Sequence, residues 1–171
     1  MAAGRYDCIV GGITITPARE RILAWSVPYM TTLSLIVNGA RTPAIRGLAD
    51  LKTASVGVQA ATTDYDAAVA MRKKGEIGGV KVYPFDRIGE AIADLEAGRI
   101  TAVMKVAPVA AWFVRQRPGL RVVAQVPDDP QPLGIGVGKN ARALRAAIDR
   151  ALAAMRRDGT TARLKRKWGV R

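Results

Sequence analysis

The stretch that most restricts the fold is GGITITPARERILAWSVPYM, residues 11–30, which follows the apolar run Asp7–Val10. The apolar run is typical of a buried strand, and the glycines that end it let another molecule approach the main chain closely. Thr16 suits the N-cap of a helix, and Pro17 suits its first position. The pattern therefore predicts a strand, a turn of small residues and a helix.

This turn gathers groups that bind anions. Exposed amides, the hydroxyls of Thr14 and Thr16 and the guanidinium of Arg19 are expected at one strand end, an arrangement suited to a carboxylate or a phosphate. The alternative is a solvated Arg19 in an ordinary strand–turn–helix connection, because cap signals are common and specific sites are rare. The local pattern alone leaves both interpretations open.

Composition limits the classes of protein and site. The chain has 171 residues, of which 49% are hydrophobic and 24% charged, as in one globular domain or two small lobes. No apolar run is long enough to span a membrane, and MAAGRYD lacks the features of a secretory signal. The single Cys8 is predicted to be a core residue. Without histidine, a His/Cys zinc site and a histidine-dependent triad are excluded, and we expect no metal or other cofactor.

The formal charge of +13 raises nucleic acid as a partner, but the basic residues are spread along the chain. They are densest between Arg156 and Lys167, and the apolar residues in and beside this segment, available for one helix face, are Leu152, Met155, Leu164 and Trp168. We interpret this segment as an amphipathic helix with one solvated basic face and one packed face. No nucleic-acid docking element accompanies the charge, so we predict no nucleic-acid partner.

Strands and helices alternate along the rest of the chain, which indicates an α/β fold. One unit repeats the logic of the opening stretch: the predicted strand Ser55–Gln59 leads through small residues and Thr62-Thr63 into a predicted helix over 65–74, so hydroxyls and amides again lie at a helix N-terminus. Further strands are predicted at 33–37, 81–85, 100–103, 120–126 and 133–137, helices at 88–97 and 108–115, and a turn or linker at 128–132. Residues 141–168 are predicted to form one or two closing helices with a break near Asp158-Gly159.

Five segments together resemble the family 3 extracellular solute-binding proteins, the polar amino-acid receptors of ABC importers. They are GRYDCIVGGITITPARERILAWSVPYM (4–30), LADLKTASVGVQAATT (48–63), YPFDRIGEAIADLEAGRITAVM (83–104), PLGIGVGKN (132–140) and RRDGTTARLKRKWG (156–169). The first resembles the family's G-x-T-x-T-x-x-R turn, and the second its V-G-V-Q-x-G-T-T entry to a second lobe. Each segment is a weak signal, but their order and spacing are specific.

The resemblance implies a two-lobed periplasmic-binding-protein (type II) fold with a two-strand hinge. Lobe I would comprise residues 1–36 and 128–171, and lobe II residues 37–127. The ligand would lie in the cleft between the lobes. Arg19 would clamp its α-carboxylate, Gly12 and Thr14 would add main-chain and hydroxyl groups, and Thr62 and Thr63 would contribute from lobe II. Arginine's planar fork suits a carboxylate, and a helix N-terminus adds partial positive charge.

The chain departs from the family pattern at two places. Judged against the usual size of such receptors, about 60 to 70 residues of lobe I are missing before Tyr6, so lobe I is expected to be incomplete at its N-terminus. In the family, an aspartate that pairs with the ligand ammonium ends the strand that contains Ala102-Val103-Met104-Lys105; here Val106 takes its place. Lys105 is the last candidate ligand-binding residue, with an outward-facing lysine as the alternative.

The resemblance implies a non-catalytic receptor that captures an amino acid or a related small carboxylate in the periplasm and presents it to an ABC transporter permease. The protein would not itself be embedded in the membrane. The alternative within the fold is a periplasmic enzyme similar to cyclohexadienyl dehydratase, or a ligand-sensing domain. Val106 cannot titrate, and this favours binding over catalysis.

Overall fold

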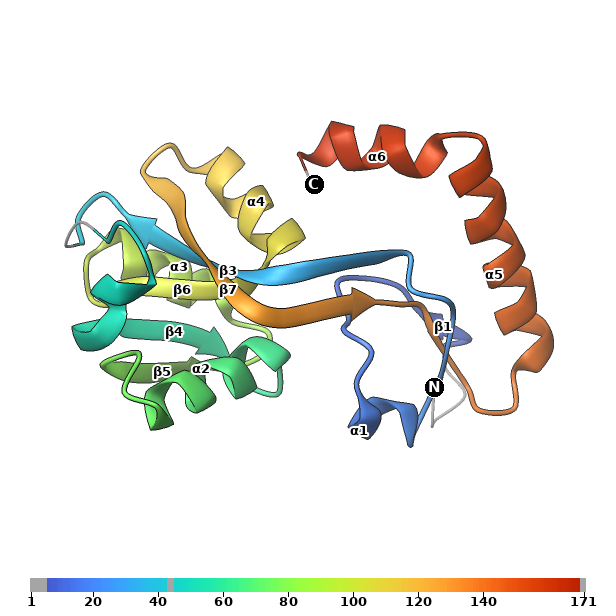
Figure 1. Cartoon of the computed structure of the whole chain (residues 1–171), viewed down its shortest axis with the longest axis horizontal. Helices are drawn as coiled ribbons and strands as arrows, with labels where there is room; N and C mark the ends of the chain where they lie inside the picture. The colour runs from blue at the N-terminus through green and yellow to red at the C-terminus, as the bar shows by residue number, and fades with distance from the viewer. Residues whose placement is uncertain (1–5, 43–44, 170–171) are drawn as a thin grey trace. The chain divides into compact units, whose positions relative to one another are not determined.

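The computed structural model of the chain describes residues 6–42 and 45–169, so most of the segment on which the expectation of no secretory signal rests lies outside it. The chain divides into two compact units, unit 1 with residues 1–32 and 130–171 and unit 2 with residues 33–129. Two long strands, β3 (Met30–Gly39) and β7 (Leu120–Leu133), run from one unit into the other (Figure 1). The predicted lobe boundaries at 36/37 and 127/128 fall inside these two strands.

Unit 2 is built on a five-stranded sheet with the order β5-β4-β6-β3-β7. Strands β4 (Ser55–Gln59), β5 (Gly79–Tyr83) and β6 (Ala102–Val106) are parallel to one another, and β3 runs antiparallel to β6. The strand β4 coincides with the predicted one. Because β4 and β6 are parallel neighbours, their C-terminal ends meet at the same edge of the sheet.

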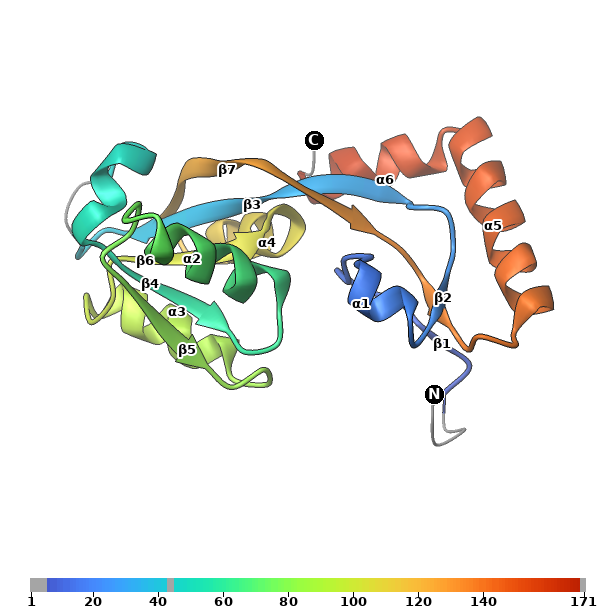
Figure 2. The same ribbon diagram turned by 60° about the horizontal axis from the view of Figure 1, so that its bottom comes forward.

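Helices cover both faces of this sheet (Figure 2). The 3₁₀ helix η1 (Leu48–Thr53) and helix α2 (Thr63–Lys73) pack on one face over a core that includes Val56, Val58 and Met104. Helices α3 (Ile88–Glu96) and α4 (Ala107–Gln116) pack on the other face over a core that includes Val37 and Val103. Neighbouring strand residues thus supply opposite cores, as the pleat requires.

A charged cluster ties β5 to α3 on the surface of unit 2. Asp94 accepts hydrogen bonds from Lys81 Nζ, the Tyr83 hydroxyl and Arg99 Nε, each at 2.6 Å. The bond from Lys81, followed by those from Tyr83 and Arg99, holds the pKa of Asp94 well below its usual range. Burial, followed by the bond to Asp94, raises the pKa of Tyr83. The cluster therefore keeps a charged carboxylate paired across the whole range of ordinary pH.

Unit 1 contains short strands in its described residues. Strands β1 (Cys8–Ile9) and β2 (Ala24–Trp25) both pair antiparallel with β8 (Gly136–Val137), and helix α1 (Pro17–Glu20) lies between β1 and β2 in the chain. The prediction that the first strand is buried and that Cys8 is a core residue is wrong, because both residues of β1 are exposed. An edge strand with one neighbour, β8, has little to cover it.

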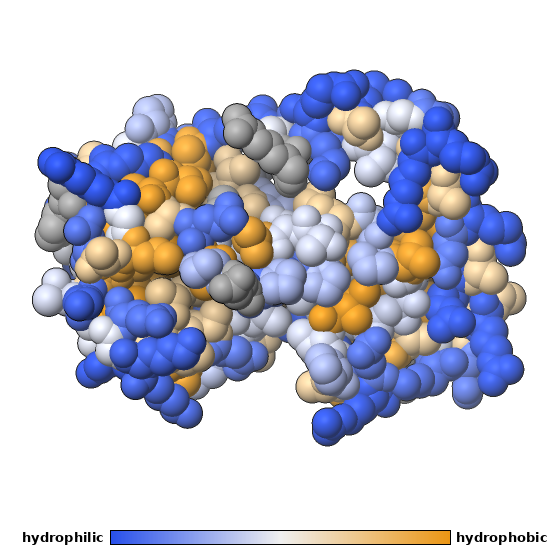
Figure 3. All heavy atoms as spheres, viewed as in Figure 1, coloured by the Kyte–Doolittle hydropathy of each residue, from blue (hydrophilic) through white to orange (hydrophobic). Residues whose placement is uncertain are grey.

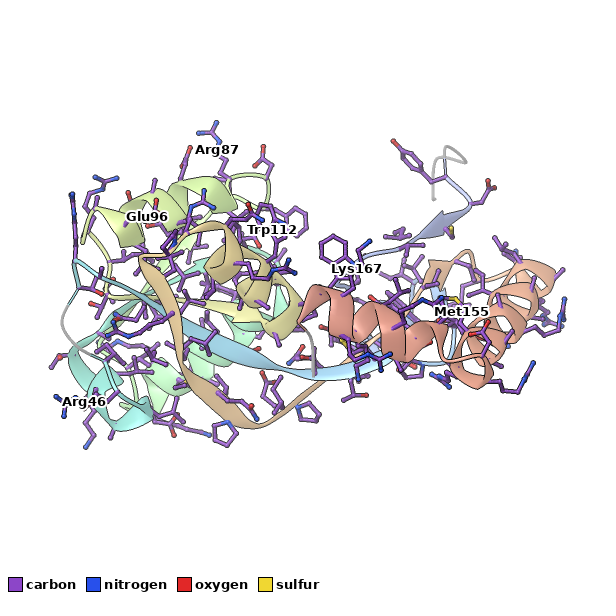
Figure 4. The ribbon with its side chains drawn as sticks, turned by 90° about the horizontal axis from the view of Figure 1, so that it is seen from above. Arg46, Arg87, Glu96, Trp112, Met155 and Lys167 are labelled. Atoms are coloured by element: carbon purple, nitrogen blue, oxygen red, sulfur yellow. The ribbon has the colours of Figure 1, made fainter. Side chains whose placement is uncertain are left out.

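The C-terminal segment forms helices α5 (Arg142–Arg157) and α6 (Thr160–Trp168), which meet at Gly159. Gly159 has a φ of 76°, a left-handed conformation that favours glycine and ends α5 near the predicted break. Figure 3 shows hydrophilic residues over both helices, and Figure 4 shows Lys167 on α6 and Met155 on α5.

The predicted packed face of this segment is only partly correct. Leu152 is buried in α5, whereas Leu164 and Trp168 in α6 are exposed. Helix α6 contacts helix α5, which precedes it in the chain. This contact does not cover the side chains of Leu164 and Trp168.

Among the described residues, no helix is both long and apolar enough to cross a membrane.

Candidate ligand-binding site

The local pattern around Arg19 folds as the sequence predicts. Thr16 is the N-cap of α1, with its Oγ1 accepting a hydrogen bond from the Arg19 amide at 3.3 Å, and Pro17 occupies the first helical position. Thr16 has an extended backbone, as an N-cap residue should. The short helix therefore begins at a defined point and fixes where the Arg19 side chain leaves the main chain.

Thr14 holds the guanidinium of Arg19 in place. Arg19 Nη1 donates to the Thr14 carbonyl at 2.8 Å, and Thr14 Oγ1 donates to Gln131 Oε1 at 2.8 Å. Thr14 is buried and forms a backbone bridge with Leu133, the last residue of β7. Arg19, which is half-buried, is thus oriented through a residue that is itself fixed to a strand. This arrangement suits a guanidinium that must present its planar fork in one direction.

The glycines before Thr14 lie in a bend on the surface. Gly12 is exposed, and the carbonyl of the neighbouring Gly11 accepts a hydrogen bond from the Tyr29 hydroxyl. Burial raises the pKa of Tyr29, which keeps this hydroxyl protonated as a donor. The structure therefore brings Gly12, Thr14 and Arg19 into one segment of unit 1.

The other two predicted hydroxyl residues lie at the start of α2 in unit 2. Thr62 is the N-cap: its Oγ1 accepts from the Tyr65 amide at 3.2 Å and donates to the Gln59 carbonyl at 2.8 Å. Thr63 is the first helical residue, and both threonines are half-buried. The N-terminus of an 11-residue helix, whose amides carry partial positive charge, thus follows directly on the C-terminal end of β4.

Ala61, immediately before this cap, has a φ of 57°, and among the described residues it is the only non-glycine with a positive φ. A left-handed conformation costs an L-residue about 1–2 kcal/mol. We expect Ala61→Gly to raise the free energy of unfolding of unit 2 by about 1 kcal/mol, measured by urea denaturation. Ala60→Gly is the matched control and should lower it by about 0.5–1 kcal/mol, because glycine there only adds flexibility. Equal effects of the two variants would contradict the assignment of strain to Ala61.

Lys105 is buried, with 4% of its surface exposed, and its ammonium is engaged inside unit 2. Lys105 Nζ donates to Gln59 Oε1 at 2.7 Å and to Asp64 Oδ2 at 2.9 Å, while Ser34 Oγ donates to Asp64 Oδ1 at 2.9 Å. Asp64 is 2% exposed and is the second residue of α2. Gln59 also donates through Nε2 to the carbonyl of Phe85. The predicted contact of Lys105 with a ligand stays a prediction, and these partners favour an indirect role.

Sequence reasoning did not single out Asp64, Gln59 or Ser34. An acidic residue in the first turn of a helix is a common dipole-complementing feature, so Asp64 gave no specific signal. The signal that could have found the pair is the register of the parallel strands β4 and β6: Gly57 lies opposite Val103, so two residues further on Gln59 and Lys105 share one edge of the sheet. Val106, where the family carries an aspartate, is 5% exposed and is the N-cap of α4 without a side-chain cap.

Comparison with known proteins assigns the chain to a family. The sequence profile of the bacterial extracellular solute-binding proteins, family 3, matches residues 1–171. The chain belongs to this family. The resemblance found in the sequence is thereby confirmed.

Two curated relatives of this family 3 protein come from Escherichia coli (strain K12). ABC transporter arginine-binding protein 1 is 29% identical over 168 residues, and L-cystine-binding protein TcyJ is 27% identical over 165 residues. Each alignment covers 96% of this chain, but only 66% and 60% of the relatives. The chain therefore spans slightly less than two thirds of the length of these relatives.

Solved structures confirm the predicted α/β periplasmic-binding-protein fold. An ancestral arginine-binding protein bound to arginine is 33% identical, with a TM-score of 0.81 over 97% of this chain and 73% of that one. An ancestral amino acid-binding protein, described as a precursor of cyclohexadienyl dehydratase, is 30% identical, with a TM-score of 0.79 over 97% of this chain and 69% of that one.

Proposed function

We propose that this family 3 protein is the solute-binding receptor of an ABC importer, and that it binds an amino acid or a related small carboxylate. The observation that carries the proposal is the orientation of the Arg19 guanidinium. Its Nη1 donates a hydrogen bond to the Thr14 carbonyl at 2.8 Å, and Thr14 forms a backbone bridge with Leu133 at the end of β7. An oriented guanidinium forms paired, charge-assisted bonds to a carboxylate. The family match and the relatives named for arginine and cystine binding support the same class of solute.

Each unit, taken by itself, carries groups suited to a small carboxylate solute. In unit 1, Arg19 binds the carboxylate, with Thr14 and Gly12 beside it. In unit 2, Thr62 and Thr63 offer hydroxyls and amides at the N-terminus of α2, where the helix dipole favours an anionic or strongly polar group. The partner is the permease of the importer, and the periplasm is the proposed location, as for the arginine-binding relatives.

Binding rather than catalysis is proposed, although one similar structure is described as a precursor of a dehydratase. An enzyme of this fold requires a titratable group in contact with its substrate. Val106 cannot titrate, and the carboxylate of Asp64 and the ammonium of Lys105 are bonded to each other and buried. These features support a receptor over the dehydratase-like alternative.

Isothermal titration calorimetry with succinate, L-glutamate, L-glutamine and L-arginine tests the proposal. We expect saturable binding at one site per chain for at least one of these carboxylates, with the ligand recovered unchanged after hours of incubation, as followed by its NMR spectrum. No binding of any member of the panel by the folded protein would contradict the receptor. Conversion of a bound ligand would favour the enzyme.

Val106→Asp tests whether a carboxylate at position 106 raises the affinity of the proposed site for a solute with an ammonium group. A carboxylate at this position would offer the ammonium of an α-amino acid a charged partner, worth about 1.5–3 kcal/mol. We therefore expect the affinity for L-glutamine, relative to succinate, to rise about tenfold or more, as measured by competition calorimetry. Val106→Asn is the matched control, since it adds a similar shape without charge. If the affinity for L-glutamine relative to succinate is the same in both variants, position 106 does not contact the ammonium of the solute.

A further inference from the structure

The chemistry of unit 2 around the start of α2 depends on two buried charges. Asp64 and Lys105 are the only charged side chains that are buried in the part of the chain that the structure describes. They pair at 2.9 Å, and Ser34 and Gln59 provide further hydrogen bonds. Burial of both ions makes their interaction strong, because water screens it little.

The pair is connected to the groups proposed to bind the ligand. Asp64 follows Thr63 directly in α2. Gln59 accepts a hydrogen bond from Lys105 through its side chain and another from the Thr62 hydroxyl through its main-chain carbonyl. Neither charged side chain is exposed: 2% of the surface of Asp64 and 4% of that of Lys105 are accessible. Their charges still act on the start of α2, because a buried charge is felt over several ångströms in a protein of low effective dielectric constant.

The signs of these charges determine which ligand group is favoured there. Asp64 alone would place a full negative charge at the start of α2, outweigh the partial positive charge of the helix dipole, and favour a cation. Lys105 cancels that carboxylate, so the partial positive charge of the helix N-terminus remains. A carboxylate or an amide then binds more favourably at Thr62 and Thr63 than an ammonium or a guanidinium does.

We propose that the buried Lys105–Asp64 pair determines the charge preference of this receptor, and that the pair directs the start of α2 toward an anionic or neutral group of the solute and against a cationic one. The inference rests on the proposed function and narrows its substrate class to acidic or neutral carboxylates. Lys105 and Asp64 are positioning residues: they act through the electrostatic potential and the orientation of α2, without contacting the solute.

The test compares the affinities for succinate and L-arginine in four forms of the full chain: the unchanged protein, Lys105→Gln, Asp64→Asn and the double variant. The glutamine and asparagine side chains retain hydrogen-bonding groups, which limits structural damage. We expect the unchanged protein to prefer succinate. Lys105→Gln should shift the ratio of affinities toward arginine about tenfold, Asp64→Asn should shift it about tenfold toward succinate, and the double variant should return to within about threefold of the unchanged protein.

Opposite shifts from the two single variants would support the proposal, because loss of structure alone would shift both in the same direction. Shifts of the same sign, or an unchanged ratio in variants that bind, would overturn this inference and leave the receptor function intact. Absence of binding by all four folded proteins would overturn the receptor function and the inference with it. For a variant that is partly unfolded, the same comparison is made from the increases in Tm produced by the two ligands.

Discussion

Arg19→Ala is expected to abolish measurable binding of small carboxylates by this family 3 protein while its fold is retained. Truncation of one partner in a buried, hydrogen-bonded charge pair costs about 2–5 kcal/mol, which corresponds to a loss of roughly 30-fold to several thousandfold in affinity. The measurement is calorimetry with succinate and L-glutamate, accompanied by circular dichroism. The fold should persist, because the anchors of Thr14 to Gln131 and Leu133 do not involve the Arg19 side chain.

Two variants control for charge and position. Arg21→Ala removes an exposed guanidinium two residues further along the chain and should leave the affinity nearly unchanged. Arg19→Lys keeps the charge but loses the planar fork, so its affinity should fall between those of the unchanged protein and Arg19→Ala. Retained affinity in Arg19→Ala, or equal losses in Arg19→Ala and Arg21→Ala, would exclude Arg19 as the carboxylate-binding residue.

Asp64→Ala is expected to have the largest effect on stability. The substitution leaves the ammonium of Lys105 buried without its carboxylate, and such a loss costs about 3–5 kcal/mol. We expect the free energy of unfolding of unit 2 to fall by this amount, measured by urea denaturation with the amide signals of β4 and β6 as the probe. Asp66→Ala, in the same turn of α2 but exposed, should change it by less than about 1 kcal/mol.

The combination of Asp64→Ala with Lys105→Met distinguishes two causes of instability: the loss of the ion pair, and the burial of the Lys105 charge without a partner. Because the double variant buries no charge at this point, it should recover much of the stability that Asp64→Ala loses. If Asp64→Ala and Asp66→Ala destabilise unit 2 equally, or if the double variant is no more stable than Asp64→Ala, then the buried pair does not have the stabilising role assigned to it.

Where local rules determine the structure, the sequence was sufficient to predict it. The N-cap at Thr16, the break at Gly159 and the strand Ser55–Gln59 each depend on neighbouring residues alone, and the structure has them where they were expected. The start of α2 also follows from its cap, although the helix begins at Thr63, two residues earlier than predicted. Helix caps and short apolar runs report local backbone preferences, which need no knowledge of distant partners.

Contacts between residues that are far apart in the chain could not be predicted from the sequence. Residues 128–132, with their prolines, were predicted to form a turn or linker, and this prediction is wrong because they lie within β7. β7 is at the edge of its sheet, where proline can be accommodated without the loss of a ladder hydrogen bond. Similarly, the bond between Lys105 and Asp64 joins residues 41 apart, and it depends on the adjacency of β4 and β6, which periodicity does not reveal.

The most direct test of the receptor assignment follows the guanidinium of Arg19 by NMR during a titration with succinate. In protein labelled with ¹⁵N, with Arg19→Lys used to assign the signal, we predict that the Arg19 Nε–H resonance and the amides of Thr62 and Thr63 shift together and saturate at the same succinate concentration. Saturable binding that leaves the Arg19 signal unmoved, or that shifts Arg19 and the two threonine amides at different concentrations, would contradict the binding of one solute molecule by Arg19, Thr62 and Thr63.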